Sequence, residues 1–93
     1  MDLTNFADRV AKLRHEFSRA TSTLALNQFQ QKAFLFVVER LQEIEAECRA
    51  GKLKPQNRRY PEITRIVIET DTTTLDPALG GKLIDVEEEY RST

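Results

Sequence analysis

Large apolar residues recur every three or four positions at the start of the chain, at Leu3, Phe6, Val10, Leu13 and Phe17. This spacing places the five side chains on one face of an α-helix, because a helix completes a turn in about 3.6 residues. Charged residues occupy the intervening positions, as they do in a helix that packs on a core with one side only. The pattern predicts a helix over about residues 3–20.

A second apolar stripe runs from Leu26 to Cys48, with no proline inside it. The hydroxyl-rich segment 21–23 precedes the stripe and favours a turn and a helix cap, because such side chains compete for backbone hydrogen bonds. Gly51 follows the stripe in the position where helices commonly stop. We therefore expect a second helix over about residues 24–50, which forms a helical hairpin with the first.

The middle of the second helix is apolar on every side, because residues 34–38 read Phe-Leu-Phe-Val-Val. One neighbouring helix covers only one face of such a cylinder. Either the C-terminal third of the chain or a second copy of the protein must cover the other face. We take the C-terminal third as the first candidate.

The C-terminal third supports two interpretations. Residues 63–70 are rich in β-branched side chains, which favour a strand, yet their apolar members also fit helical spacing. Pro61 and the pair Asp76-Pro77 are typical of helix starts. The residues alone leave open an all-α fold with two shorter helices, at about 62–71 and 77–90, and an α+β fold with a C-terminal β-hairpin that pairs 63–70 with 82–90.

The length and composition predict one small domain that spans residues 1–93. The chain has 93 residues, of which 40% are hydrophobic, enough for a single core. A basic segment with Pro55 near its centre is expected to be a connecting loop, residues 51–60. The longest apolar run, Ala33 to Val38, is too short to cross a membrane, and no signal sequence opens the chain. These features predict a cytoplasmic protein with no membrane contact.

The charges are divided along the chain. Residues 1–59 contain 11 Lys or Arg and 7 Asp or Glu, whereas residues 60–93 contain 3 and 8. The total of -1 argues against a general nucleic-acid binder. The acidic C-terminal part can nevertheless steer and orient an oppositely charged partner.

No residue pattern indicates catalysis. A single histidine, His15, and a single cysteine, Cys48, cannot form a tetrahedral metal site or a disulfide within the chain. His15 is expected on the polar face of the first helix, and Cys48 on the apolar stripe of the second. We expect no catalytic residues, no metal, no cofactor and no enzymatic activity.

Three segments together resemble a family of small immunity proteins from type VI secretion systems. The segments are Phe6 to Val10, Gln30 to Ile44, and Ile66 to Tyr90 with Asp76-Pro77-Ala78-Leu79 at its centre. The family protects its host from interbacterial toxins that hydrolyse NAD and NADP, and related loci carry other nucleotide-targeting toxins. The resemblance implies a mainly helical domain, which favours helices over the β-hairpin in the C-terminal third.

The resemblance, the acidic C-terminal field and the lack of catalytic groups lead to one functional hypothesis. The chain is expected to bind a cognate toxin, an NAD(P) glycohydrolase or another nucleotide-targeting effector, and to occlude its active site. Carboxylates complement a cleft that binds phosphates, and a tyrosine such as Tyr60 or Tyr90 can serve as an anchor. The residues expected to contact the toxin are Glu69, Asp71, Asp76, Glu87, Glu88, Glu89 and Tyr90.

The alternative hypothesis is a homodimeric helical adaptor or transcriptional regulator. In that case a second copy covers the apolar centre of the second helix, and the basic loop contacts nucleic acid or another protein.

Overall fold

The protein is all-α in the computed structural model, which describes residues 3–59 and 62–93. The elements in chain order are α1 (Leu3–Thr23), α2 (Gln28–Ala50), the 3₁₀ helix η1 (Gln56–Arg58), α3 (Ile63–Glu69), α4 (Thr72–Leu75) and α5 (Pro77–Ser92). Within the described residues there is no strand, so the expected helical fold is confirmed and the alternative C-terminal β-hairpin is wrong. None of the described helices combines the length and the apolar character that crossing a bilayer requires.

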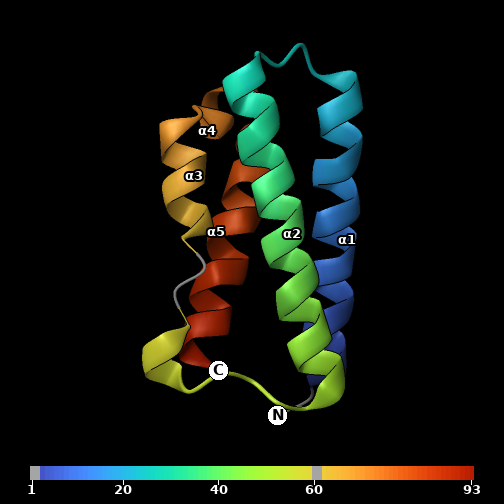
Figure 1. Cartoon of the computed structure of the whole chain (residues 1–93), viewed down its shortest axis with the longest axis vertical. Helices are drawn as coiled ribbons and strands as arrows, with labels where there is room; N and C mark the ends of the chain where they lie inside the picture. The colour runs from blue at the N-terminus through green and yellow to red at the C-terminus, as the bar shows by residue number, and fades with distance from the viewer. Residues whose placement is uncertain (1–2, 60–61) are drawn as a thin grey trace.

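The hairpin of α1 and α2 forms one side of the molecule, with the two helices side by side along its long axis (Figure 1). α1 continues to Thr23, past the expected end, and within its last turn the hydroxyls of Thr21 and Thr23 donate to carbonyls one turn earlier, at 2.9 and 3.0 Å. α2 starts at Gln28 instead of 24, because Asn27 caps it. The Asn27 side chain accepts from the Gln30 amide at 2.8 Å, and the Gln30 side chain accepts from the Asn27 amide at 3.2 Å.

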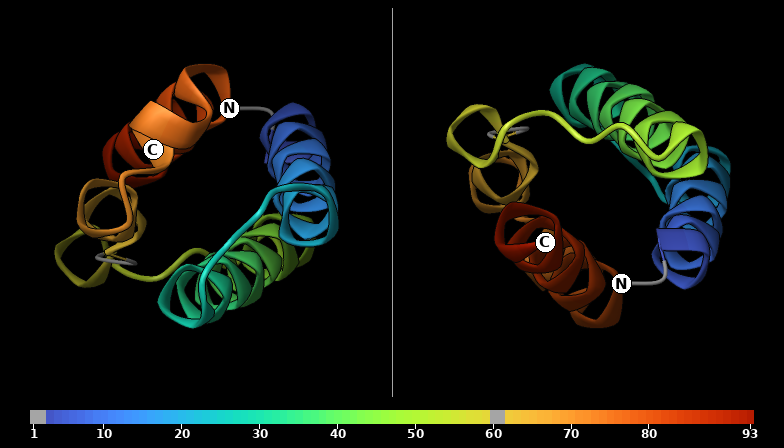
Figure 2. Two further views of the ribbon diagram at one scale, coloured as in Figure 1. Left: turned by 90° about the horizontal axis from the view of Figure 1, so that it is seen from above. Right: turned by 90° about the horizontal axis from the view of Figure 1, so that it is seen from below.

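The C-terminal helices close the core on the side of α2 that α1 leaves open. Viewed along the long axis, α1, α2, α3 and α5 surround a common interior (Figure 2). Phe34 of α2 is buried against Phe17 of α1, with the ring centres 5.2 Å apart in an edge-to-face arrangement. The C-terminal part supplies the buried side chains Ile63, Val67, Leu79, Leu83, Val86 and Tyr90.

The helix expected over about 62–71 is confirmed as α3, and a further short helix that the sequence did not predict, α4, follows it. Asp71 separates them in the left-handed region, with φ of 54° and ψ of 32°. A residue in that conformation ends the regular hydrogen-bonding pattern of a right-handed helix. α5 then begins as expected, because Asp76 accepts a hydrogen bond from the Leu79 amide at 3.1 Å and Pro77 occupies the first turn.

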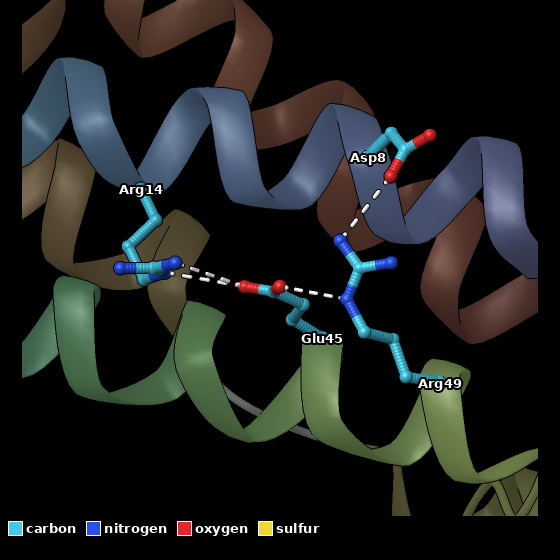
Figure 3. Close-up of polar contacts among 4 residues, drawn as sticks. All are labelled: Asp8, Arg14, Glu45 and Arg49. Carbon is cyan, nitrogen blue, oxygen red and sulfur yellow. Dashed lines mark hydrogen bonds and ion pairs between the residues drawn. The ribbon is translucent and has the colours of Figure 1, made fainter.

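A cluster of four charged side chains joins α1 to α2 (Figure 3). The Glu45 carboxylate accepts from Arg14 of α1 at 3.1 Å and from Arg49 of its own helix at 2.9 Å, and Arg49 also donates to Asp8 at 3.2 Å. Burial by itself disfavours the charged form of Glu45, but the hydrogen bonds from Arg49 and Arg14 outweigh it, so the pKa of Glu45 lies below its ordinary value. The carboxylate is therefore charged where it joins the two helices.

Replacement of Glu45 with Gln tests this cluster. A carboxyl group with a lowered pKa stabilises the fold above its unfolded-state pKa, and this contribution is lost as the pH falls through the folded-state value. We expect E45Q to lower the free energy of unfolding by about 1–2 kcal/mol at pH 7, and by progressively less below the ordinary value of 4.5. Urea unfolding followed by circular dichroism at several pH values measures the difference. The exposed Glu43→Gln change is the control and should alter stability by less than about 0.5 kcal/mol.

Two glycines provide a matched pair for a second prediction. A Cβ atom added to Gly81, inside α5, has no atom within 4 Å, so Gly81→Ala should stabilise the protein by about 1 kcal/mol through helix propensity. Gly51 ends α2 with φ of 67°, a backbone conformation that alanine disfavours. Gly51→Ala should therefore destabilise the protein by about 1 kcal/mol, although a Cβ atom added at Gly51 also meets no atom within 4 Å. The midpoint temperature of thermal unfolding should rise for Gly81→Ala and fall for Gly51→Ala. A shift of the same sign and size in both variants contradicts the roles assigned to the two glycines.

Candidate protein-binding surface

The six acidic residues expected to contact the toxin fall into two groups in the structure. Contacts within the chain hold three of these six, and the other three are exposed, although one of the exposed three, Glu69, also pairs with Arg65 of its own helix. The held residues are Asp76, Glu87 and Glu89, and the exposed ones are Glu69, Asp71 and Glu88. The acidic surface is therefore smaller than the sequence alone predicts.

Glu87 is a buried cap for α3, although it belongs to α5. Its residue is only 8% exposed, and its carboxylate accepts a hydrogen bond from the Ile63 amide at 3.0 Å. The first amides of a helix lack partners within the helix, and Glu62 directly before α3 makes no side-chain cap. The Glu87 carboxylate supplies this cap from a neighbouring helix. Its negative charge also interacts favourably with the positive, N-terminal end of the α3 dipole.

Tyr90 is also buried in the core. It is 2% exposed, and its hydroxyl donates to the Glu47 carboxylate of α2 at 2.8 Å. Burial, together with this hydrogen bond, raises the pKa of Tyr90, so the hydroxyl stays protonated and keeps donating. Its role is to close the core where α5 meets α2. Tyr60, the other tyrosine considered as an anchor, lies outside the described residues.

The basic loop is fastened at the same place. The Glu47 carboxylate also accepts from the Lys54 amide at 3.2 Å, and Arg59 donates to the carbonyl oxygens of Lys54 and Tyr90 at 2.6 and 3.3 Å. The Arg59 guanidinium lies 5.9 Å from the centre of the Tyr90 ring. Two of the loop's cations are thus used to hold the loop on the bundle, and Lys52 and Arg58 remain exposed.

The remaining two residues of the first group complete the internal contacts. Glu89 forms a double hydrogen bond with Arg9 of α1, and Asp76 caps α5 as described above. These carboxylates tie α5 to α1 and fix the start of α5, so part of their charge is already balanced within the chain.

The exposed acids Glu69 and Asp71 lie beside two exposed apolar side chains. Ile68 is 68% exposed and Leu75 is 41% exposed, so both side chains leave apolar surface in contact with solvent. We refer to these four residues at the junction of the two short helices as the α3–α4 corner. Exposed apolar side chains can bury area against a partner, and the neighbouring carboxylates can form the polar rim of such an interface. We therefore take this corner as a candidate protein-binding site.

Hydrogen bonds hold the α3–α4 corner in one conformation. The hydroxyls of Thr70 and Thr72 lie 2.7 Å apart, and the two residues are 3% and 1% exposed. The side-chain amide of Gln30, in the first turn of α2, donates to the Thr70 carbonyl at 3.2 Å. Asp71 between the two threonines has a left-handed backbone, which costs about 1–2 kcal/mol outside glycine and persists only where its surroundings enforce it. The corner is therefore preorganised.

Sequence reasoning missed both apolar members of this corner. Ile68 belongs to the β-branched segment that also fits a strand, where alternate residues face one core. In a helix, however, Ile68 does not lie on the face that carries Ile63, Val67 and Thr70. This spacing could have predicted that Ile68 is exposed. Leu75 carried no such signal, because its exposure depends on the break between α3 and α4.

The groups that could perform chemistry lie apart in the structure. Cys48 is 4% exposed, and burial raises the pKa of its thiol, which disfavours the reactive thiolate. His15 is exposed on α1. In the part of the chain that the structure describes, no three His, Cys, Asp or Glu side chains converge in a way that could hold a metal ion.

A surface hollow of about 540 Å³ beside the end of α5 is lined by Gln56, Asn57, Glu88, Arg91 and Ser92.

Comparison of the chain with protein-family models, with curated proteins and with solved structures finds no match in any of the three.

Neighbouring residues on α5 allow the two kinds of carboxylate to be compared. Glu87→Ala removes the acceptor of the Ile63 amide and leaves that buried donor unpaired, so we expect a loss of about 1–3 kcal/mol in the free energy of unfolding. Glu88→Ala removes an exposed carboxylate and should change stability by less than about 0.5 kcal/mol. Chemical denaturation of both variants tests the assignment, and similar stabilities for the two variants contradict it.

Proposed function

We propose that this chain is an immunity protein that binds a cognate interbacterial toxin and occludes its active site, without chemistry of its own. The observation that supports this best is the α3–α4 corner, where two exposed aliphatic side chains adjoin two exposed carboxylates on a preorganised turn. The resemblance to immunity proteins of type VI secretion systems motivates the choice of partner. In this proposal the protein acts in the cytoplasm, where an incoming toxin reaches its substrate.

The apolar and acidic members of the corner have different roles in this proposal. Ile68 and Leu75 supply the buried contact area from which most affinity arises, because a few well-packed side chains dominate an interface. A nanomolar complex requires about 12 kcal/mol, and an interface of standard size buries about 1,600 Å² in total. Surrounding residues of α3, α4 and α5 therefore contribute contact area as well, and Glu88 remains a candidate among them.

The carboxylates orient the toxin as it approaches and raise the rate of association. A toxin that hydrolyses NAD(P), or that acts on another nucleotide, needs positive charge to bind phosphate groups, and carboxylates of an inhibitor complement that charge. Glu69 already pairs with Arg65 at 2.9 Å, and both side chains are exposed. Asp71 forms no ion pair within the described residues, so its charge, unlike that of Glu69, is available to a partner.

Co-expression with the toxin encoded beside this chain tests the proposal. The wild-type protein should allow growth of cells that produce the toxin. Ile68→Ala should weaken toxin binding by about 10-fold or more, because it removes an apolar anchor while alanine keeps α3 helical. The matched control Leu35→Ala removes another exposed aliphatic side chain, on α2 instead of α3, and should preserve protection. Cell death despite soluble expression of the wild-type chain contradicts the proposal.

The charge of Asp71 is tested separately with Asp71→Asn. Asparagine also accepts the left-handed backbone, so the substitution removes the charge and preserves the turn. We expect the association rate with the toxin to fall by about two- to tenfold at low salt and its dependence on salt to weaken, with little change in the dissociation rate. Stopped-flow or surface-plasmon measurements give both rates, and an unchanged association rate removes Asp71 from the interface.

A further inference from the structure

The outward face of α2 carries exposed apolar side chains among its polar residues, whereas the exposed side of a surface helix is usually polar throughout. We define this face by four residues spaced along one side of the helix, Lys32, Leu35, Phe36 and Glu39. The buried residues of α2, among them Phe34, Val37 and Leu41, point to the opposite side. Leu35 is 55% exposed, so the C-terminal helices do not complete the covering that an all-round apolar segment requires.

Phe36, beside Leu35, is partly exposed and is held in place by its neighbour Arg40. The Arg40 guanidinium lies 4.9 Å from the centre of the Phe36 ring, and its own charge is paired with Glu43 at 2.8 Å. Leu35 and Phe36 together form an apolar centre in the N-terminal half of α2.

Opposite charges flank this apolar centre symmetrically. Lys32 lies about one turn before it and Glu39 about one turn after it, and both side chains are exposed. Within the described residues neither Lys32 nor Glu39 takes part in an ion pair. Both charges are therefore available to groups outside the chain.

We propose that two copies of the chain form a two-fold symmetric dimer through the outward faces of their α2 helices. If the helices cross antiparallel at the point between residues 35 and 36, Lys32 of each copy faces Glu39 of the other. Leu35 of each copy then faces Phe36 of the other. A two-fold interface repeats each contact twice, so this single arrangement forms two ion pairs around a continuous apolar centre.

The charge pattern favours a second copy over an unrelated protein as the occupant. When two copies of a helix cross antiparallel on a two-fold axis, a residue before the crossing point in one copy faces the residue equally far after that point in the other copy. Like charges at those two positions would repel, whereas Lys32 and Glu39 attract. The net charge of -1 also leaves little repulsion between whole chains. The dimer face shares no residue with the α3–α4 corner, so this inference is independent of the proposed toxin binding.

Charge reversal tests the pairing. Lys32→Glu and Glu39→Lys each turn two attractive contacts into two repulsive ones, and each should raise the dissociation constant of the dimer by about tenfold in sedimentation equilibrium. The double variant K32E/E39K restores opposite charges and should recover the wild-type constant. An equimolar mixture of the two single variants, one of them labelled with ¹⁵N, should form a heterodimer, which native mass spectrometry distinguishes from either homodimer by mass.

Leu35→Glu tests the apolar centre. It should yield particles with the mass of one chain, 10.7 kDa, with the helical circular dichroism spectrum unchanged. Ile68→Glu is the matched control, because it makes the same change at an exposed isoleucine outside the proposed face, and it should remain dimeric. A wild-type mass of one chain at every concentration overturns the proposal, and so does a double charge variant that associates no better than the single variants.

Discussion

The burial of α2 on two sides is the constraint on which the rest of the structure depends. Phe34 of α2 packs against Phe17 of α1, and the C-terminal helices bring Ile63, Val67 and Leu83 to the remaining buried face. A hairpin of two helices cannot bury a helix that is apolar all round, so α3 and α5 are required for a closed core. Their exact placement then decides which C-terminal residues face solvent.

This placement explains why so much of the acidic charge is used internally. Glu87 must cap α3 where α5 packs beside it, and Glu89 must meet Arg9 where α5 passes α1. Tyr90 and Glu47 close the same end of the bundle and fasten the basic loop to it. The carboxylates left for a partner are those at the break between α3 and α4 and on the outer side of α5.

Local periodicity predicted the two long helices and most of their buried residues, because one face of each helix meets a single continuous core. It did not predict that α2 starts at Gln28, since the cap by Asn27 depends on a side-chain contact and not on apolar spacing. It also could not distinguish helix from strand over residues 63–70, where β-branched residues fit both patterns. The partner of Glu87 lies 24 positions away in the sequence, so no local signal could reveal that Glu87 is a cap.

In the proposal above, the protein acts through its surface, and the α3–α4 corner contacts the toxin. Hydrogen–deuterium exchange of this protein with and without its cognate toxin tests this contact. Slower exchange of the amides of residues 68–75 is expected when the toxin is bound, together with an inactive toxin. Unchanged exchange over these residues in a complex that is nevertheless inhibited would rule out the corner as the site of contact.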